Sequence, residues 1–184
     1  MTRSTILHTE RLTLRPYRDR DIAELVPLIG AREVALTTLR IPHPYTEQDA
    51  REFLSNTKDG GEVRRAITLR ADGKLIGGIG LVVNQQHQHA ELGYWLGVPY
   101  WGKGYATESA RVLVRYGFEE LHLHRIFALH FKHNPGSGRV LAKLGMRHEG
   151  CQREHVCKWD QFVDSELYGL LRQEWELDRK KLPQ

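Results

Sequence analysis

The stretch HAELGYWLGVPYWGKGYATES, residues 89–109, decides how this chain folds and what it can bind. The stretch is predicted to begin with an apolar strand, which is followed by a proline, a turn that contains Gly102 and Gly104, and a helix. The glycines let a ligand approach the main chain closely. The amides of a loop that enters a helix lack partners, and the helix dipole adds positive potential there. The turn therefore predicts a site for a phosphate or pyrophosphate, with Lys103 as an added positive charge.

The composition is that of an ordinary globular protein. The 184 residues are 40% hydrophobic and 27% charged, which fits one domain over residues 1–184 with a sizeable core. The net charge of +4 is mild and comes without a dense basic run, so it suits an anionic cofactor rather than nucleic acid. No apolar run reaches the roughly 18–20 residues of a membrane span, and the N-terminus lacks the apolar core of a signal peptide. We therefore expect a cytoplasmic protein without nucleic-acid or membrane partners.

Cysteine and histidine content raises the question of a disulfide or a metal. Two cysteines, Cys151 and Cys157, are too few for a disulfide scaffold, and we expect reduced thiols. The ten histidines include two pairs spaced two residues apart, but no cluster reproduces the paired spacings of a zinc site. We expect no functional metal.

Periodicity predicts the order of the elements. Alternating apolar residues indicate strands over residues 11–15, 63–70, 74–83, 89–97, 125–131, 146–157 and 161–171. Helices are predicted from Asp19 or Asp21 to Gly30, from Thr46 onward, and over residues 105–119, 134–143 and 172–182, with a loop over residues 37–45. A meander followed by strand–helix–strand units predicts an α/β fold with one mixed, mostly antiparallel sheet of about seven strands, flanked by helices. If the strands 89–97 and 125–131 are parallel, the crossover between them is right-handed.

The glycine turn matches neither GxGxxG nor GxxxxGK[ST]. Through Trp101-Gly102-Lys103-Gly104-Tyr105-Ala106 it resembles the acyl-CoA loop of the GNAT N-acetyltransferases, whose pattern is Q/R-x-x-G-x-G/A. Trp101 replaces the usual Gln or Arg, a departure typical of the branch similar to RimJ and RimL, the acetyltransferases of ribosomal protein N-termini. Residues 9–15, 134–137, 143–146 and 149–150 resemble the same branch.

This resemblance implies acetyl-CoA as cosubstrate, bound where the sheet opens between residues 89–97 and 125–133. The pantetheine arm is expected to pair with the main chain of Trp95, Leu96 and Val98, as an added strand does. The pyrophosphate is expected on the amides of residues 102–106. Asn134 is expected to face the same gap, although it also fits a helix cap before Pro135. The expected cofactor-binding residues are Trp95, Leu96, Val98, Trp101, Gly102, Lys103, Gly104, Tyr105, Ala106, Thr107, Asn134 and Ser137.

The implied reaction is direct acetyl transfer to a primary amine. Glu91 is the first candidate for the base that takes the amine proton, and Glu154 is the second; as an alternative, Glu91 is a charge-paired or solvent-facing strand residue. Ser137 resembles the serine that protonates the leaving thiolate in the RimL branch, but it also fits a helix cap. Tyr168 is the alternative acid. The Leu96 amide is expected to stabilise the oxyanion if the strand bulges there.

Three functions stay open at this point. The first is acetylation of a protein or peptide N-terminal α-amine, and the second is acetylation of a small amine such as a polyamine, amino acid or antibiotic. The third is a CoA-binding module without turnover. An acidic acceptor cleft favours a cationic small molecule, and an open cleft favours a protein terminus. We expect acceptor specificity to depend on the loop 37–45 and on the loop around Trp159. The resemblance also implies a monomer or homodimer.

Overall fold

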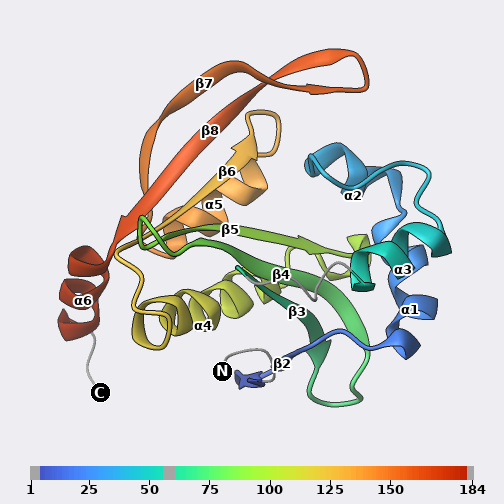
Figure 1. Cartoon of the computed structure of the whole chain (residues 1–184), viewed down its shortest axis with the longest axis horizontal. Helices are drawn as coiled ribbons and strands as arrows, with labels where there is room; N and C mark the ends of the chain where they lie inside the picture. Colours follow the sequence, from blue (N-terminus) through green and yellow to red (C-terminus); the bar gives the residue numbers. More distant parts are fainter. Residues whose placement is uncertain (1–4, 56–60, 182–184) are drawn as a thin grey trace.

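The computed structural model describes residues 5–55 and 61–181. One mixed eight-stranded sheet runs in the order β1-β2-β3-β4-β5-β6-β8-β7, with helices on both sides (Figure 1). The strands are β1 (Leu7–His8), β2 (Leu12–Arg15), β3 (Glu62–Leu69), β4 (Leu75–Asn84), β5 (His89–Leu96), β6 (Arg125–Phe131), β7 (Arg147–Lys158) and β8 (Gln161–Leu171). The α-helices are α1 (Ile22–Ile29), α2 (Arg32–Thr37), α3 (Glu47–Ser55), α4 (Tyr105–Glu119), α5 (Pro135–Lys143) and α6 (Arg172–Lys181). The expected mixed sheet with flanking helices is confirmed.

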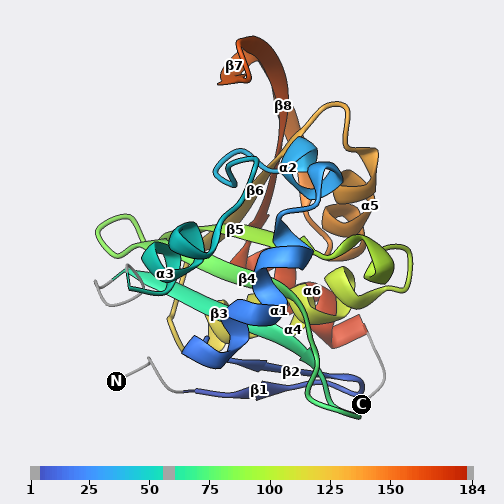
Figure 2. The same ribbon diagram turned by 90° about the vertical axis from the view of Figure 1, so that its right-hand side faces the viewer.

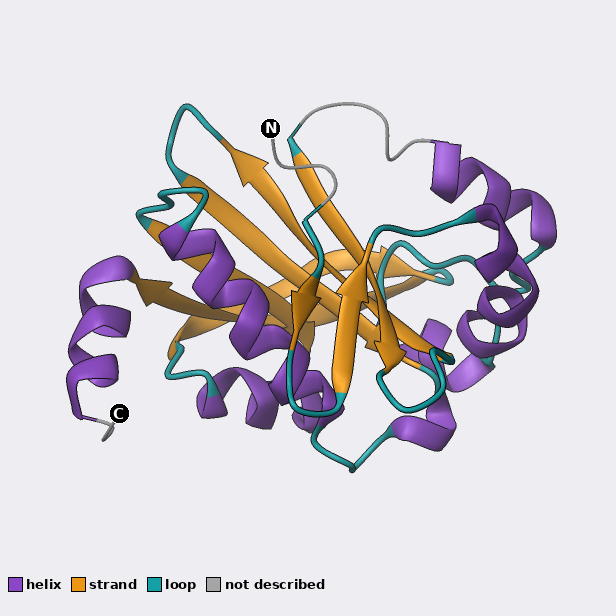
Figure 3. Cartoon of the chain, turned by 90° about the horizontal axis from the view of Figure 1, so that it is seen from below, coloured by secondary structure: helices purple, strands orange, loops and turns teal. Residues whose placement is uncertain are grey.

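The sheet is antiparallel except at one place. Strands β2 to β5 form a meander, and β6, β8 and β7 form a second antiparallel group. Among the described strands, only β5 and β6 are parallel, and they are joined by α4, which lies across the strands when the molecule is seen from below (Figure 3). Their pairing ends at Glu91 and Phe127, although β5 continues to Leu96 and β6 to Phe131. The sheet therefore splits between its two antiparallel halves.

Two hydrophobic clusters hold the layers together. The larger lies between α4 and the sheet, where Val114 and Phe118, four residues apart on one face of the helix, are buried. The smaller lies under α1 and α3 and contains Leu25 and Leu75. Each such fully buried side chain contributes roughly 1.5–3 kcal/mol. The larger cluster contains residues of both β5 and β6, such as Leu92 and Ile126, so it joins the two antiparallel halves on the α4 side of the sheet.

Most predicted elements match the observed ones within a residue or two. The exceptions are β1 and α2, which are too short for a period to show. The helix predicted from Thr46 onward begins with a reciprocal cap: the Thr46 amide donates to the Asp49 carboxylate at 2.7 Å, and the Asp49 amide donates to the Thr46 hydroxyl at 3.2 Å. The predicted end of the last helix, at Leu182, lies outside the described residues.

The β7–β8 hairpin extends beyond the rest of the sheet and arches toward α2 (Figures 1 and 2). Its register shifts twice, between His148 and Gly150 and between Gln152 and Val156. Such irregularities bend and twist a strand pair. The hairpin tip is thereby brought to the loop between α2 and α3, which Lys158 contacts directly.

Candidate active site

A cavity of about 1080 Å³ opens where β5 and β6 part. It reaches from the loop before α4, through the split in the sheet, to the loop between α2 and α3. Side chains from both hydrophobic clusters line it, so it connects the two sides of the sheet. Its size suits an extended ligand together with a second, smaller molecule.

The turn before α4 presents a row of unpaired main-chain donors. Gly102 and Gly104 have φ of +73° and +83°, the left-handed region that favours glycine. The first helical hydrogen bond runs from the amide of Glu108 to the carbonyl of Gly104. Within the described chain, no acceptor pairs with the amides of residues 102–107. These free donors at the positive end of a 15-residue helix form the expected anion site.

Hydrogen bonds from the N-terminal segment hold this turn in place. The Glu108 carboxylate accepts hydrogen bonds from the Thr9 hydroxyl at 2.5 Å and from the Arg11 amide at 2.9 Å. Arg11 also donates to the carbonyl of Lys103 at 3.1 Å. Burial alone would raise the pKa of Glu108, but the hydrogen bonds from Thr9 and Arg11 outweigh it and lower the pKa. The segment 9–15 thus has a structural role in shaping the anion site.

Ten of the twelve expected cofactor-binding residues line the cavity. They are Trp95, Leu96, Trp101, Gly102, Gly104, Tyr105, Ala106, Thr107, Asn134 and Ser137. Val98 instead packs against the smaller hydrophobic cluster. The Lys103 ammonium lies 5.9 Å from the centre of the Tyr100 ring, beside the turn.

The main chain of β5 is available to a ligand only at alternate residues. The amide of Gly97 donates to the carbonyl of Ile76 on β4 at 2.9 Å. Since alternate residues of an antiparallel ladder face the same neighbour, Trp95 turns its main chain toward β4 and Leu96 faces the gap. The Leu96 carbonyl accepts a hydrogen bond from the Trp101 indole at 2.7 Å. The expected pairing with Trp95 therefore needs correction: the Leu96 amide faces the gap, and it does so without a bulge.

Glu91 lies at the point where the sheet splits. It forms the last pair with Phe127, and its half-buried carboxylate lines the cavity. The nearest cation is Arg40, whose Nη2 lies 3.6 Å from Glu91 Oε2. Glu91 is therefore paired with a cation and also lies on the cavity wall.

The hydroxyl groups of Ser137 and Tyr94 form a hydrogen bond in the wall of the cavity, with 2.6 Å between their oxygens. Burial raises the pKa of Tyr94 to about 12, so this hydroxyl stays protonated at neutral pH. The Ser137 amide donates to Asn134 Oδ1 at 3.3 Å, so Asn134 also caps α5. Sequence reasoning missed Tyr94, although its alternation with Leu96 on one strand was a usable signal.

The second candidates, Glu154 and Tyr168, are not among the described residues that line the cavity. Glu154 is an exposed residue of β7 with φ of +50°. Tyr168 packs its ring against His130 and His148, with ring centres 5.5 and 5.1 Å apart. The structure thus brings Glu91 and Ser137 to one cavity and leaves the other two outside it.

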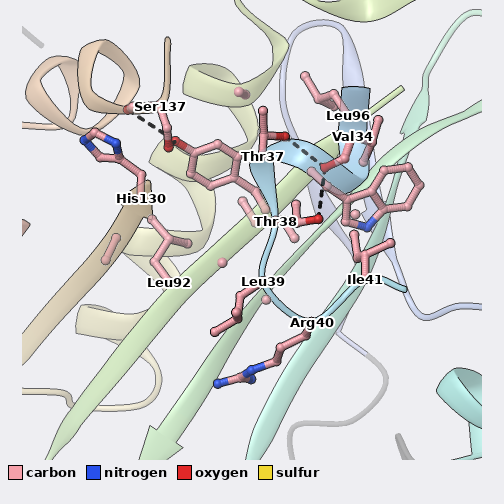
Figure 4. A pocket seen from close by; sticks show the side chains of 18 of the residues that line it. Val34, Thr37, Thr38, Leu39, Arg40, Ile41, Leu92, Leu96, His130 and Ser137 are labelled. Carbon is pink, nitrogen blue, oxygen red and sulfur yellow. Dashed lines mark hydrogen bonds between the residues drawn. The ribbon is translucent and has the colours of Figure 1, made fainter. Parts of the chain in front are cut away.

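His130 was not singled out by the sequence. It is 8% exposed, lines the cavity and bonds through Nδ1 to the Phe131 carbonyl at 2.9 Å. Its Nε2 is buried and has no partner among the described residues. A lone histidine within a strand gives no sequence signal for this position. In Figure 4 it lies beside Ser137, across the cavity from the loop that carries Leu39 and Arg40.

Neither a metal cluster nor a membrane-spanning helix occurs in residues 5–55 and 61–181. No group of three or more His, Cys, Asp or Glu in these ranges could hold a metal ion. Each helix of the described chain is too short or too polar to cross a membrane.

Comparison with known proteins agrees with this geometry. A family model described as an acetyltransferase (GNAT) domain matches residues 11–147. The uncharacterized N-acetyltransferase YnaD of Bacillus subtilis is 35% identical over 131 residues, which cover 71% of this chain and 77% of that protein. The [ribosomal protein uS5]-alanine N-acetyltransferase of Escherichia coli is 34% identical over 94 residues, covering 51% and 48%. A GNAT-family acetyltransferase structure from Bacillus anthracis aligns with a TM-score of 0.83 at 28% identity, covering 92% of this chain and 99% of that one.

The split sheet with an amide-rich turn at a helix N-terminus defines an acetyl-CoA-dependent acetyltransferase. The chain belongs to the GNAT family of N-acetyltransferases, and its ribosomal-protein relatives support the RimJ-like branch.

Proposed function

We propose that this chain acetylates the α-amine of a peptide or protein N-terminus, or of a similar α-amino compound. The observation that carries the proposal is the split beyond Glu91, where a carboxylate, a hydroxyl pair and the amide turn share one cavity. The relative from Escherichia coli is named as an alanine N-acetyltransferase of ribosomal protein uS5, which supports this acceptor class.

Each group has a role in direct transfer. The pyrophosphate of acetyl-CoA binds the amides of residues 102–107, and the pantetheine lies in the gap beside Leu96. Glu91 takes a proton from the acceptor ammonium, directly or through water, and thereby frees the nitrogen lone pair. The α-amine of a peptide has an ordinary pKa of about 7.7–8, so this step needs less assistance than it would for a lysine amine at about 10.4.

The second half of the reaction breaks the thioester. The amine nitrogen bonds to the acetyl carbonyl carbon, and the Leu96 amide stabilises the resulting oxyanion. The C–S bond then breaks, and the thiolate takes a proton from the hydroxyl pair of Tyr94 and Ser137. The pair is reprotonated by the second proton that the nitrogen loses as the amide forms. Asn134 caps α5 through Oδ1 and keeps its amide nitrogen for the pantetheine.

A small cationic amine is the second candidate because carboxylates line the acceptor side of the cavity. They are Asp49, Glu52, Glu62 and Glu91. All four already have partners within the chain: Asp49 and Glu52 accept hydrogen bonds from Thr46 and Gln48, Glu62 pairs with Arg64, and Glu91 pairs with Arg40. This internal pairing favours the α-amine over a polycation.

A CoA-release assay on a panel of amines tests the proposal. We expect turnover with short peptides that have a free N-terminus. Turnover with polyamines alone would favour the second candidate. Tight CoA binding in calorimetry without turnover of any amine would indicate a CoA-binding module and would contradict the proposed activity.

A further inference from the structure

The loop between α2 and α3 is fixed by a lysine from the hairpin tip. Lys158 Nζ lies 2.6 Å from the Thr38 carbonyl oxygen, 3.0 Å from that of Ile41 and 3.3 Å from that of Leu39. An ammonium has three donors, so all of them are used on this loop. We call residues 38–41 the acceptor loop.

A second contact holds the same region from the side of the cofactor gap. The ring Nε2 of His133, just after β6, lies 3.0 Å from the Leu36 carbonyl oxygen at the end of α2. At the hairpin tip, the Trp159 and His43 rings approach to 6.1 Å between centres. Contacts from two separate parts of the second antiparallel group therefore set the position of the acceptor loop over the cavity.

The acceptor loop presents Arg40 to the cavity. Its side chain is 69% exposed, and its Nη2 lies 3.6 Å from Glu91 Oε2, beyond normal hydrogen-bond length. The guanidinium donates no hydrogen bond to any residue of the described chain. In Figure 4 the Leu39 and Arg40 side chains lie over the strands, opposite Ser137 and His130. Arg40 thus forms an ion pair with the proposed base, while its guanidinium donors form no hydrogen bond within the described chain.

We propose that Arg40 binds a carbonyl or carboxylate oxygen that lies next to the amine of the acceptor, and that Lys158 positions Arg40 for this contact. The inference rests on the proposed function, in which the acceptor amine lies beside Glu91. In an α-amino compound an oxygen lies three bonds from the amine nitrogen, within reach of a guanidinium on the far side of that carboxylate. A polyamine offers only methylenes and a second ammonium there, which the guanidinium repels.

The chemistry of the two partners supports this assignment. Guanidinium donors form strong, directional hydrogen bonds to carbonyl and carboxylate oxygens. The backbone carbonyl of a peptide N-terminus and the carboxylate of a free amino acid are the two sources of such an oxygen. The other lining arginine on this side, Arg64, is paired with Glu62 and lies over the Phe53 ring, so it does not compete for this role.

Matched acceptors test Arg40. Alaninamide carries the oxygen next to its amine, isopropylamine lacks it, and free alanine replaces the carbonyl by a carboxylate. For Arg40→Gln we expect kcat/KM with alaninamide to fall about ten- to hundredfold, mainly through KM, with little change for isopropylamine. A larger fall for alanine than for alaninamide would assign the free amino acid as the source. An equal fall for isopropylamine, or unchanged turnover of alaninamide, would overturn the assignment.

Lys158→Met tests the positioning role, and Lys132→Met is its matched control. Lys132, just after β6, pairs with Asp164 of β8 at 3.1 Å and does not contact the acceptor loop. We expect Lys158→Met to raise the acceptor KM and to speed amide hydrogen exchange over residues 38–41, while acetyl-CoA affinity stays unchanged. Lys132→Met should show neither effect.

The two variants also separate this inference from the proposed function. If Lys158→Met keeps both the KM and the slow exchange, the positioning role is overturned. If the wild-type chain turns over no α-amino acceptor, the proposed function and this inference fail together. If the wild type and Arg40→Gln turn over α-amino acceptors equally well, only the inference fails.

Discussion

Gly104 is the residue whose backbone conformation most directly serves the cofactor. With φ of +83° it ends the turn and leaves the first helical amides open to an anion. A Cβ at this position would lie 3.4 Å from an Arg11 guanidinium nitrogen, so added side-chain atoms would crowd the space beside the turn. We expect Gly104→Glu to weaken acetyl-CoA binding by more than about a hundredfold in calorimetry, because a carboxylate would occupy the position of the diphosphate.

Gly73 is the control for that change. It lies in the turn between β3 and β4 with φ of +74°, and a Cβ there would meet nothing within 4 Å. Gly73→Glu therefore carries the same left-handed strain, of about 1 kcal/mol, without touching the cavity. Equal losses of cofactor affinity in both variants would show that strain, and not the anion site, explains the result.

A substitution of Glu91 should slow the chemical step without weakening acetyl-CoA binding. Its place at the split puts the carboxylate on the acceptor side of the gap, away from the amide turn. We expect Glu91→Gln to lower kcat by about 10²- to 10⁴-fold while the acetyl-CoA Kd changes less than threefold. The pH–rate profile of the variant should also change shape. An unaltered profile would remove Glu91 as the base.

At the scale of elements, the hydroxyl pair of Tyr94 and Ser137 links β5 to α5 across the gap. Either Tyr94→Phe or Ser137→Ala should lower kcat by roughly tenfold, since each removes one member of the same proton-donating pair. The double variant should lose little more than either single variant, because the two residues act as a unit. Fully additive losses in steady-state kinetics would assign the residues separate roles.

Sequence patterns predicted the long elements and missed the short ones. The bounds of α4, β6 and β8 followed from sustained periods and clear stops. The two residues of β1 and the six of α2 contain too few buried positions to establish a period. The split between β5 and β6 was expected only from the family resemblance, because strand order depends on contacts distant in sequence.

The residues of the candidate site likewise include some that the sequence predicted and some that it missed. The turn at residues 102–107 could be predicted because its chemistry is local: glycines, free amides and a helix start. Glu91 and Ser137 were placed from the resemblance. Arg40 and Lys158 were missed because their partners, Glu91 and the acceptor loop, lie far away in sequence. Such long-range polar contacts leave no periodic signal.

At the scale of the whole molecule, the two halves of the sheet cooperate through the cavity rather than through a continuous ladder. One antiparallel group supplies Glu91 and the wall around Trp95, and the other supplies His130 and the Lys158 contact to the acceptor loop. A ligand in the gap takes the place of the hydrogen bonds that β5 and β6 do not form with each other beyond Glu91 and Phe127. Acetyl-CoA should therefore stabilise the fold by contacts to both halves, and ligand-free protein should be the less stable form.

The same cavity makes overall stability sensitive to high pH. Burial raises the pKa of both Tyr45 and Tyr94 to about 12, whereas an ordinary tyrosine has a pKa of 10.0. The folded state therefore keeps protons that the unfolded chain releases near pH 10. This contribution is fully present below about pH 10 and is lost as the pH rises through about 12.

We expect the free energy of unfolding, measured in urea, to fall between about pH 9.5 and 11.5, by on the order of 1 kcal/mol for each of these two hydroxyls. The Tyr45→Phe/Tyr94→Phe double variant has no such protons to retain, so its stability should decline less steeply over the same range. Equal slopes for the wild type and the double variant would mean that the two hydroxyls titrate alike in the folded and unfolded states, and hence that the cavity wall around them is open to water.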